Sequence, residues 1–294
     1  MISKFDNKNI CIDSLSKALS NSSLALVLGA GISSNFGLPD WNKLIENLCL
    51  KSNVSYAEGT PNEDLARLCK KKLKDKYIPT VKELLYENFK IEKIIDYPLL
   101  VAIGAMCTGS KMRGSVSNVV TYNFDDVLEK YFYYYGIVPE VIKEFPYYEK
   151  KSDVRIIHPH GFLPYGDDTN DSNDIALDAS TLRRESRNDT FWNELQVVFK
   201  HNTLLFMGIS FNDTNLKDLI ELCKEGHPSH NTHDDPIGFW FIKESDIADT
   251  CSKYQENKNR IEVLKLDRIY PIMINDWNEI PYILCSICQK AVKQ

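Results

Sequence analysis

The chain has 294 residues, of which 43% are hydrophobic and 26% charged, and its formal net charge at pH 7 is −6. This is the composition of an ordinary globular protein with a buried core, and the negative charge argues against direct electrostatic binding to nucleic acid or an anionic membrane. The sequence has no apolar stretch long enough to span a bilayer and no secretory signal in its first twenty residues, so we expect a cytoplasmic protein.

The first half of the chain contains one predicted strand and several predicted helices. Residues 24–29 (LALVLG) form an apolar run typical of a buried strand, between an amphipathic helix at 10–21 and a second helix from about Asp40. Residues 61–109 are helical by pattern throughout, with prolines as breaks. We interpret residues 61–109 as a helical insertion, a small subdomain within a single domain of residues 1–294.

In the second half, apolar strand patterns alternate with helical ones. Helices are predicted after residue 124, where Gly136 ends the pattern, at 190–202, after residue 210 with an Asn or Asp cap, and at the end of the chain. The predicted strands are 118–124, 154–158, 203–208, 236–243, 260–266 (RIEVLKL) and 270–274. Strands separated by helices predict an α/β fold with a doubly wound, Rossmann-like parallel sheet. In such sheets ligands bind beyond the carboxyl ends of the strands.

Eight cysteines are scattered along the chain, which favours reduced thiols over a disulfide framework. Cys285 and Cys288 form the one close pair, and a zinc site usually needs a second such pair. Both thiols also fit the apolar stripe of a terminal helix. We therefore expect no metal.

The first predicted strand ends in a glycine turn, Gly29-Ala30-Gly31-Ile32-Ser33. Ser34 stands where the usual dinucleotide fingerprint has its third glycine, so an ordinary dehydrogenase site is not indicated. Glycine allows a backbone to approach a pyrophosphate closely, and a following helix offers unpaired N–H groups. A plain strand-to-helix turn is the alternative interpretation.

Two further loops carry polar residues at predicted strand ends. In the run 121–126 (TYNFDD), Asp125 or Asp126 can cap the following helix, whereas Asn123 is harder to explain in that way. In HPHG, His160 beside Gly161 is a candidate general base, although a lone histidine is more often structural. His158 is less favoured for that role.

The fourth loop begins at Gly208 and continues through Ser210 to Asp213, where a strand gives way to a helix. Glycine, serine and a capping residue at a helix start can bind an anion or a ribose. All four loops fall at predicted carboxyl ends of parallel strands. Together they predict one composite nucleotide site.

Taken together, the four loops resemble the motifs of the sirtuin family, in the same order and over most of the chain. Sirtuins have a Gly-Ala-Gly turn running into Ile-Ser and Gly-Ile-Pro-Asp, and this chain has GAGIS and GLPD. Their Thr-Gln-Asn-Ile-Asp resembles TYNFD, their catalytic His-Gly resembles His160-Gly161, and their Gly-Thr-Ser turn resembles Gly208-Ile209-Ser210. The resemblance implies an NAD site in which the cofactor is a substrate, consumed rather than reduced.

The chain departs from the protein-deacylating sirtuins at several positions. It has no cysteine between residues 161 and 208, where those enzymes carry a zinc module, and it has Asn42 and Tyr122 where they have an arginine and a glutamine. It is more similar to the sirtuin-like NAD hydrolases of bacterial anti-phage defence systems, whose Gly-x-Ser-Phe-x-Asp-x-Asn-Leu run resembles GISFNDTNL here. Such domains usually belong to a larger protein or complex, and we expect this chain to be the domain alone.

The glycine turns and the resemblance together suggest a role for each candidate residue. We expect Gly29, Gly31 and Ser33 to hold the pyrophosphate and Ser210 a ribose or phosphate. The resemblance implies that Asp125 contacts the nicotinamide amide, that Asn123 orients the attacking water, and that His160 accepts a proton. The remaining expected NAD contacts are Ala30, Asp40, Gly208 and Asp213.

The implied activity is hydrolysis of NAD+ to nicotinamide and ADP-ribose by a regulated effector that depletes NAD. The alternatives are a non-catalytic sensor of NAD or ADP-ribose and, less favoured, a zinc-free deacylase or ADP-ribosyltransferase. Such an effector would need control, and we expect it from homo-oligomer assembly or from a partner ATPase or nuclease encoded in the same defence operon. The aromatic run 131–135 can supply an oligomer interface, although partial packing in the core is slightly favoured.

Overall fold

The computed structural model describes residues 3–110, 112–143, 151–166, 175, 189–209, 217, 220–221, 235–248 and 254–292. Within them, seven strands form one sheet in the order β3-β4-β2-β1-β5-β6-β7, and every neighbouring pair is parallel. The strands are β1 (Leu24–Leu28), β2 (Asn118–Thr121), β3 (Pro139–Ile142), β4 (Val154–Ile157), β5 (Thr203–Met207), β6 (Gly238–Lys243) and β7 (Ile269–Ile274). The predicted α/β class with a doubly wound parallel sheet is confirmed.

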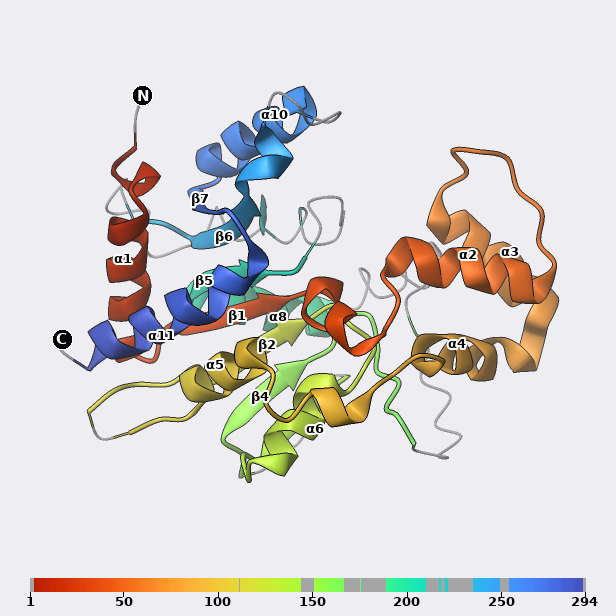
Figure 1. The fold of residues 1–294 in the computed structure, drawn as a ribbon, viewed down its shortest axis with the longest axis horizontal. Helices are drawn as coiled ribbons and strands as arrows, with labels where there is room; N and C mark the ends of the chain where they lie inside the picture. The colour runs from red at the N-terminus through yellow and green to blue at the C-terminus, as the bar shows by residue number, and fades with distance from the viewer. Residues whose placement is uncertain are drawn as a thin grey trace.

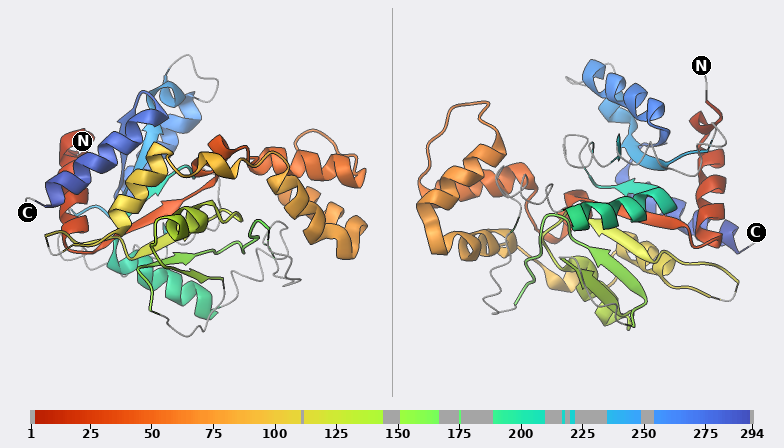
Figure 2. Two further views of the ribbon diagram at one scale, coloured as in Figure 1. Left: turned by 60° about the horizontal axis from the view of Figure 1, so that its bottom comes forward. Right: turned by 180° about the vertical axis from the view of Figure 1, so that it is seen from behind.

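Helices cover both faces of the sheet (Figures 1 and 2). The helices that pack on the sheet are α1 (Lys8–Ser20), α5 (Pro98–Cys107), α6 (Val127–Tyr134), α8 (Asp189–His201), α10 (Tyr254–Leu266) and α11 (Ile280–Ala291). The first two of these, with α6 and α11, share one hydrophobic cluster, whereas α8 and α10 contribute to a second cluster.

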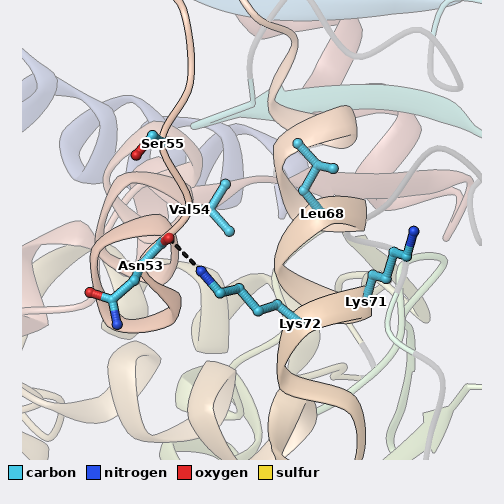
Figure 3. A pocket seen from close by; sticks show the side chains of 6 residues that line it. All are labelled: Asn53, Val54, Ser55, Leu68, Lys71 and Lys72. Carbon is cyan, nitrogen blue, oxygen red and sulfur yellow. Dashed lines mark hydrogen bonds between the residues drawn. The ribbon is translucent and has the colours of Figure 1, made fainter.

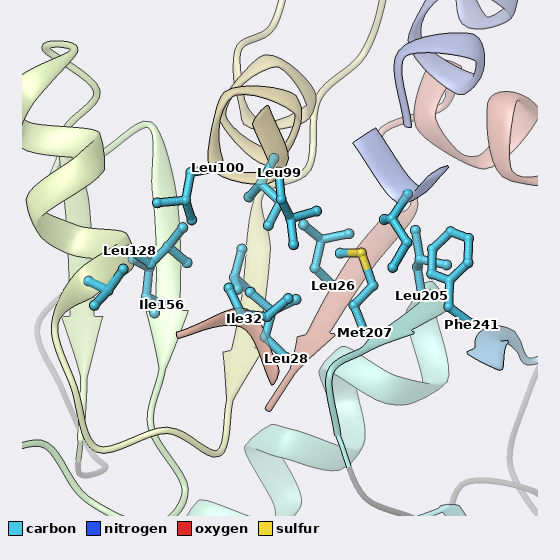
Figure 4. Close-up of a cluster of buried hydrophobic side chains, with 14 of the residues drawn as sticks. Leu26, Leu28, Ile32, Leu99, Leu100, Leu128, Ile156, Leu205, Met207 and Phe241 are labelled. Carbon is cyan, nitrogen blue, oxygen red and sulfur yellow. The ribbon is translucent and has the colours of Figure 1, made fainter. Parts of the chain in front are cut away.

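The central strand β1 shows why the sheet needs both helical layers. All five of its residues are buried, and alternate side chains belong to different clusters. Leu24, Leu26 and Leu28 join the cluster under α1, α5 and α11, part of which Figure 4 shows. Ala25 and Val27 join the cluster under α8 and α10. A strand that is buried on both faces reads as a continuous apolar run, which explains how the sequence reveals it.

Three helices form an extension beside the sheet, which we call the helical arm (Figure 1). They are α2 (Trp41–Ser52), α3 (Asn62–Leu73) and α4 (Tyr77–Tyr86), and α2 packs against both of the others. The next helix, α5, packs instead against α11 on the sheet. The helical pattern over 61–109 is thus confirmed for α3, α4 and α5, with only a 3-10 turn, Ile91–Lys93, between the last two. The division into a domain with an inserted subdomain stays a prediction.

Two elements of the structure differ from the prediction. The sequence pattern predicts a strand for the run RIEVLKL at 260–266, but this run is the second half of α10. Its buried residues Ile261 and Leu264 lie three positions apart, which is helical spacing. The edge strand β3 was not predicted, because its four residues begin with proline and include Glu140.

Two further expectations concern a membrane-spanning helix and the aromatic run 131–135. No helix in the described part of the chain is both long and apolar enough to cross a membrane. In the aromatic run, Tyr131 and Phe132 are buried, whereas Tyr133, Tyr134 and Tyr135 are exposed. Part of the run therefore packs in the core, and its use as an oligomer interface stays a prediction.

Candidate functional site

The four candidate loops follow four strands that are neighbours in the sheet. Strands β4, β2, β1 and β5 lie side by side and run parallel, so their carboxyl ends meet at one edge. The chain leaves β1 toward β2 on one side and returns on the other side at β5, so the order of strands reverses at β1. Ligands of open α/β sheets bind at such a reversal.

The turn after β1 interlocks with the turn after β5 through backbone groups. The N–H of Gly29 donates to Met207 O at 3.1 Å, and the N–H of Gly31 donates to Gly208 O at 3.0 Å. A Cβ atom at Gly29 would lie 2.5 Å from Gly208 O, and one at Gly31 would lie 2.8 Å from Gly208 Cα. Glycine is therefore required here by the contact between two turns, whatever ligand they bind.

The helix that the sequence predicts from about Asp40 is confirmed, and it does not begin directly at the glycine turn. Two short 3-10 turns, Ala30–Ile32 and Ser34–Phe36, follow β1, and helix α2 begins only at Trp41. Asp40 caps α2, because its carboxylate accepts a hydrogen bond from the Lys43 N–H at 2.8 Å. Its side chain is exposed, and a contact of Asp40 with NAD stays a prediction.

Ser33 joins the loop after β1 to the loop after β2. Its hydroxyl accepts from Asn123 Nδ2 at 3.0 Å and donates to Asp125 Oδ1 at 2.9 Å. All three side chains are buried. Ser33 is thus hydrogen-bonded to two candidate residues about 90 positions away in the sequence.

Burial raises the pKa of the Asp125 carboxyl to about 7. Hydrogen bonds from Ser33 and from the Val127 N–H lower it, and the negative charges of Glu129 and Asp126 raise it further. Burial likewise raises the pKa of Asp126, whose Oδ2 pairs with Lys130 Nζ at 3.1 Å. Near neutral pH, Asp125 can therefore either donate or accept a hydrogen bond.

His160 lies against the two residues that flank Asn123. Its ring centroid is 4.8 Å from that of Tyr122 and 6.5 Å from that of Phe124, and the imidazole is buried. Gly161 adopts a left-handed φ of +95°, and Leu163 N–H donates to Phe124 O at 2.8 Å. The loops after β2 and β4 are therefore paired, and His160 packs beside the segment that carries Asn123.

His158, which the sequence favoured less, has the more complete hydrogen bonding. Its Nδ1 lies 3.0 Å from Asn123 O, and its Nε2 lies 2.7 Å from Glu129 Oε1. Only its position next to a predicted strand end marks it in the sequence, and nothing there points to Glu129 on α6.

Tyr86 links the helical arm to the loops, and sequence reasoning missed it. Its hydroxyl lies 2.6 Å from Leu163 O and 3.2 Å from Asp126 Oδ1, so it contacts the loops after β4 and β2. Its ring also packs against Phe89 and Tyr165. An ordinary tyrosine within a helical pattern carries no signal of this role.

Two of the predicted NAD contacts, Ser210 and Asp213, lie outside the described residues. Ala30 and Gly208 lie in the interlocked turns. A separate open hollow of about 470 Å³ lies far along the helical arm, between the end of α2 and α3 (Figure 3). Its lining includes Asn53, Leu68 and Lys71 and none of the candidate residues.

Among the described residues, no group of three or more His, Cys, Asp or Glu side chains is placed to hold a metal ion. Cys285 is exposed and Cys288 is half-buried on α11, and both are free thiols. The assembled site offers an amide, a hydroxyl, a carboxyl and an imidazole. These groups suit hydrogen bonding to a polar ligand and proton transfer near neutral pH.

Comparison with known proteins gives matches over the whole sheet. The family model of the SIR2-like domain matches residues 117–264. Three curated relatives are NAD(+) hydrolases named ThsA, from Acinetobacter baumannii (strain 532279), Enterococcus faecium and Cytobacillus dafuensis. They are 23%, 22% and 22% identical over 96%, 98% and 97% of this chain, which spans only 56%, 60% and 56% of their lengths.

A solved structure concerned with the mechanism and regulation of Sir2 enzymes aligns with 96% of this chain and 97% of its own. Its TM-score is 0.49 and its sequence identity is 15%.

Replacing Ser33 by alanine should lower the free energy of unfolding by about 1–3 kcal/mol, because Asp125 and Asn123 would lose a buried partner. The neighbouring Ser34 is exposed and makes one 3.3 Å bond to Gly31 O, so its alanine variant should change stability by less than about 0.5 kcal/mol. Urea unfolding of both variants measures the difference. Equal effects would show that the Ser33 bridge does not join the loops in solution.

The raised pKa of Asp125 predicts a pH dependence of stability. Between about pH 4 and pH 7 the folded protein keeps a proton that the unfolded chain has lost, so this residue makes stability fall as pH rises, by up to about 1.4 kcal/mol per pH unit. The stability of Asp125→Asn relative to the unsubstituted protein should therefore rise from pH 4 to pH 7 and level off above it. Urea titrations across this range measure the difference. A flat difference for Asp125→Asn would contradict the assigned pKa.

Proposed function

This chain belongs to the SIR2-like domain family, and we propose that it hydrolyses NAD+ at the bond between nicotinamide and ribose. The products are nicotinamide and ADP-ribose. The observation that carries the proposal is the Ser33 bridge, which brings Asn123 and Asp125 to the strand-order reversal of the sheet. The three ThsA relatives, which carry the name NAD(+) hydrolase, support the same reaction.

The chemistry of NAD+ fits the groups at this site. Nicotinamide leaves as a neutral molecule with the electron pair of the glycosidic bond, so positive charge develops on the ribose. A protein accelerates this step by holding the ribose and a water molecule in reactive positions. In the proposed reaction, water oxygen bonds to ribose C1′ as the nicotinamide bond breaks, and the water proton passes to His160.

Each candidate residue then has one task in the proposal. Asn123 orients the attacking water and the ribose, and His160 accepts the proton. Asp125 contacts the carboxamide of nicotinamide, which offers both a donor and an acceptor. A carboxyl with a pKa of about 7 can match either one near neutral pH. The turn from Gly29 to Ser33 holds the pyrophosphate.

The cellular role follows from the stoichiometry of the proposed reaction. Each turnover destroys one NAD+, so an unregulated enzyme would exhaust the cofactor of its own cell. We propose a regulated effector that depletes NAD+ in defence against phage, controlled by assembly of copies of the chain or by a partner protein. The matched relatives extend well beyond the length of this chain, and that additional length is one place for such control.

Replacing Asn123 or His160 by alanine should lower the rate of nicotinamide release by about 100-fold or more, because each removes a group that acts on water or ribose. Release of nicotinamide and ADP-ribose from NAD+ is followed by chromatography. The exposed Asn9→Ala on α1 and His201→Ala on α8 are matched controls and should keep full activity.

Full activity in either site variant would refute its assignment. Binding of NAD+ by calorimetry without turnover, in the chain alone and in its assemblies, would instead identify a sensor. Deacylation of an acetyl-lysine peptide would identify a deacylase.

A further inference from the structure

A buried histidine–glutamate pair lies directly behind the loop that carries Asn123. The side chains of His158 and Glu129 are 0% and 3% exposed, and 2.7 Å separates His158 Nε2 from Glu129 Oε1. We propose that His158 is a positioning residue that fixes the Asn123 loop by holding its backbone carbonyl, with Glu129 fixing the imidazole in turn. This inference rests on the proposed function, because it makes Asn123 the group whose placement matters.

The contacts determine where the protons lie. The Asn123 carbonyl can only accept a hydrogen bond, so His158 Nδ1 must carry a proton and donate to it across 3.0 Å. The second ring nitrogen, Nε2, then shares one proton with Glu129 Oε1. The pair is locked in a single ring orientation, because a flipped ring would place a carbon against the carbonyl.

Packing alone does not account for this pair. Glu129 Oε2 has no hydrogen-bond partner within the described part of the chain, so this carboxyl depends on His158 for its satisfaction. A buried pair of this kind is generally no more stable than well-packed apolar residues of similar volume. What apolar residues cannot supply is a directed N–H group aimed at the Asn123 carbonyl.

The His158 contact completes the fixation of Asn123. The Asn123 N–H donates to Thr121 Oγ1 at 3.2 Å, and its side-chain amide donates to Ser33. With its carbonyl bound by His158, the residue is held through its amide, its side chain and its carbonyl. The carbonyl belongs to the peptide group that joins Asn123 to Phe124, so its hydrogen bond also fixes the orientation of that peptide plane. The Phe124 ring in turn lies near the ring of His160. Loss of the His158 contact would free this peptide plane.

Two substitutions of His158 separate its two contacts. In His158→Asn, the side-chain amide nitrogen takes the place of Nδ1 and keeps the hydrogen bond to the Asn123 carbonyl. This substitution is combined with Glu129→Gln, because the Glu129 carboxylate would otherwise be unpaired. The amide nitrogen of Gln in His158→Gln takes the place of Nε2, so that variant keeps the contact with Glu129 and loses the carbonyl contact.

We expect His158→Gln to lower kcat for NAD+ hydrolysis by about tenfold, the effect of one lost hydrogen bond, with KM changed less than about twofold. The His158→Asn/Glu129→Gln variant should keep kcat within about threefold. Hydrogen exchange provides a readout that needs no turnover, because backbone amides of residues 121–127 should exchange faster in His158→Gln and at the original rate in the double variant.

Equal kcat in the two variants, with unchanged exchange of residues 121–127 in both, would overturn the positioning role. A wild-type protein that never hydrolyses NAD+ would overturn the proposed function separately, and the exchange comparison would still decide whether His158 holds the loop.

Discussion

The turn after β1 is held between the turns of its two neighbouring strands, and the candidate site depends on this constraint. On the β5 side the contact is backbone to backbone, so close that neither Gly29 nor Gly31 can carry a side chain without a shift. On the β2 side the contact runs through the Ser33 hydroxyl. Because β1 pairs with both strands, the turn that follows it is fixed from two directions. Polar groups held in this way need little reorganisation when a ligand binds.

Further contacts fix the loops that follow β2 and β4. His158 holds the Asn123 carbonyl from the side of β4, and Tyr86 of the helical arm reaches Asp126 and Leu163. Burial and the charges of Asp126 and Asp125 raise the pKa of Tyr86, so its hydroxyl remains a proton donor. The arm is thereby connected to the same loops as the site, and a partner that moves α4 would act on them directly.

The sequence predicted the central strands well, because β1, β2, β4 and β5 are apolar runs that end in turn or polar residues. It failed for α10, where closely spaced apolar residues in RIEVLKL fit a short strand as well as a helix. It also missed β3, whose four residues carry too weak a pattern. In both places the tertiary environment decides which element forms.

The candidate site was predictable in part for a physical reason. Residues at the carboxyl ends of parallel strands meet at one edge, so Ser33, Asn123 and Asp125 could be grouped before their contacts were known. The pairing of His158 with Glu129 and the reach of Tyr86 depend on side-chain placement between distant elements. A local sequence pattern does not reveal such pairs, and the order of strands in the sheet must be known before they can be found.

The most direct test of the account is a crystal structure of the Asn123→Ala variant with NAD+ bound. We predict the pyrophosphate over residues 29–33 and the nicotinamide ribose between position 123 and His160. A cofactor bound elsewhere, for example in the hollow lined by Asn53 and Lys71 on the helical arm, would contradict it.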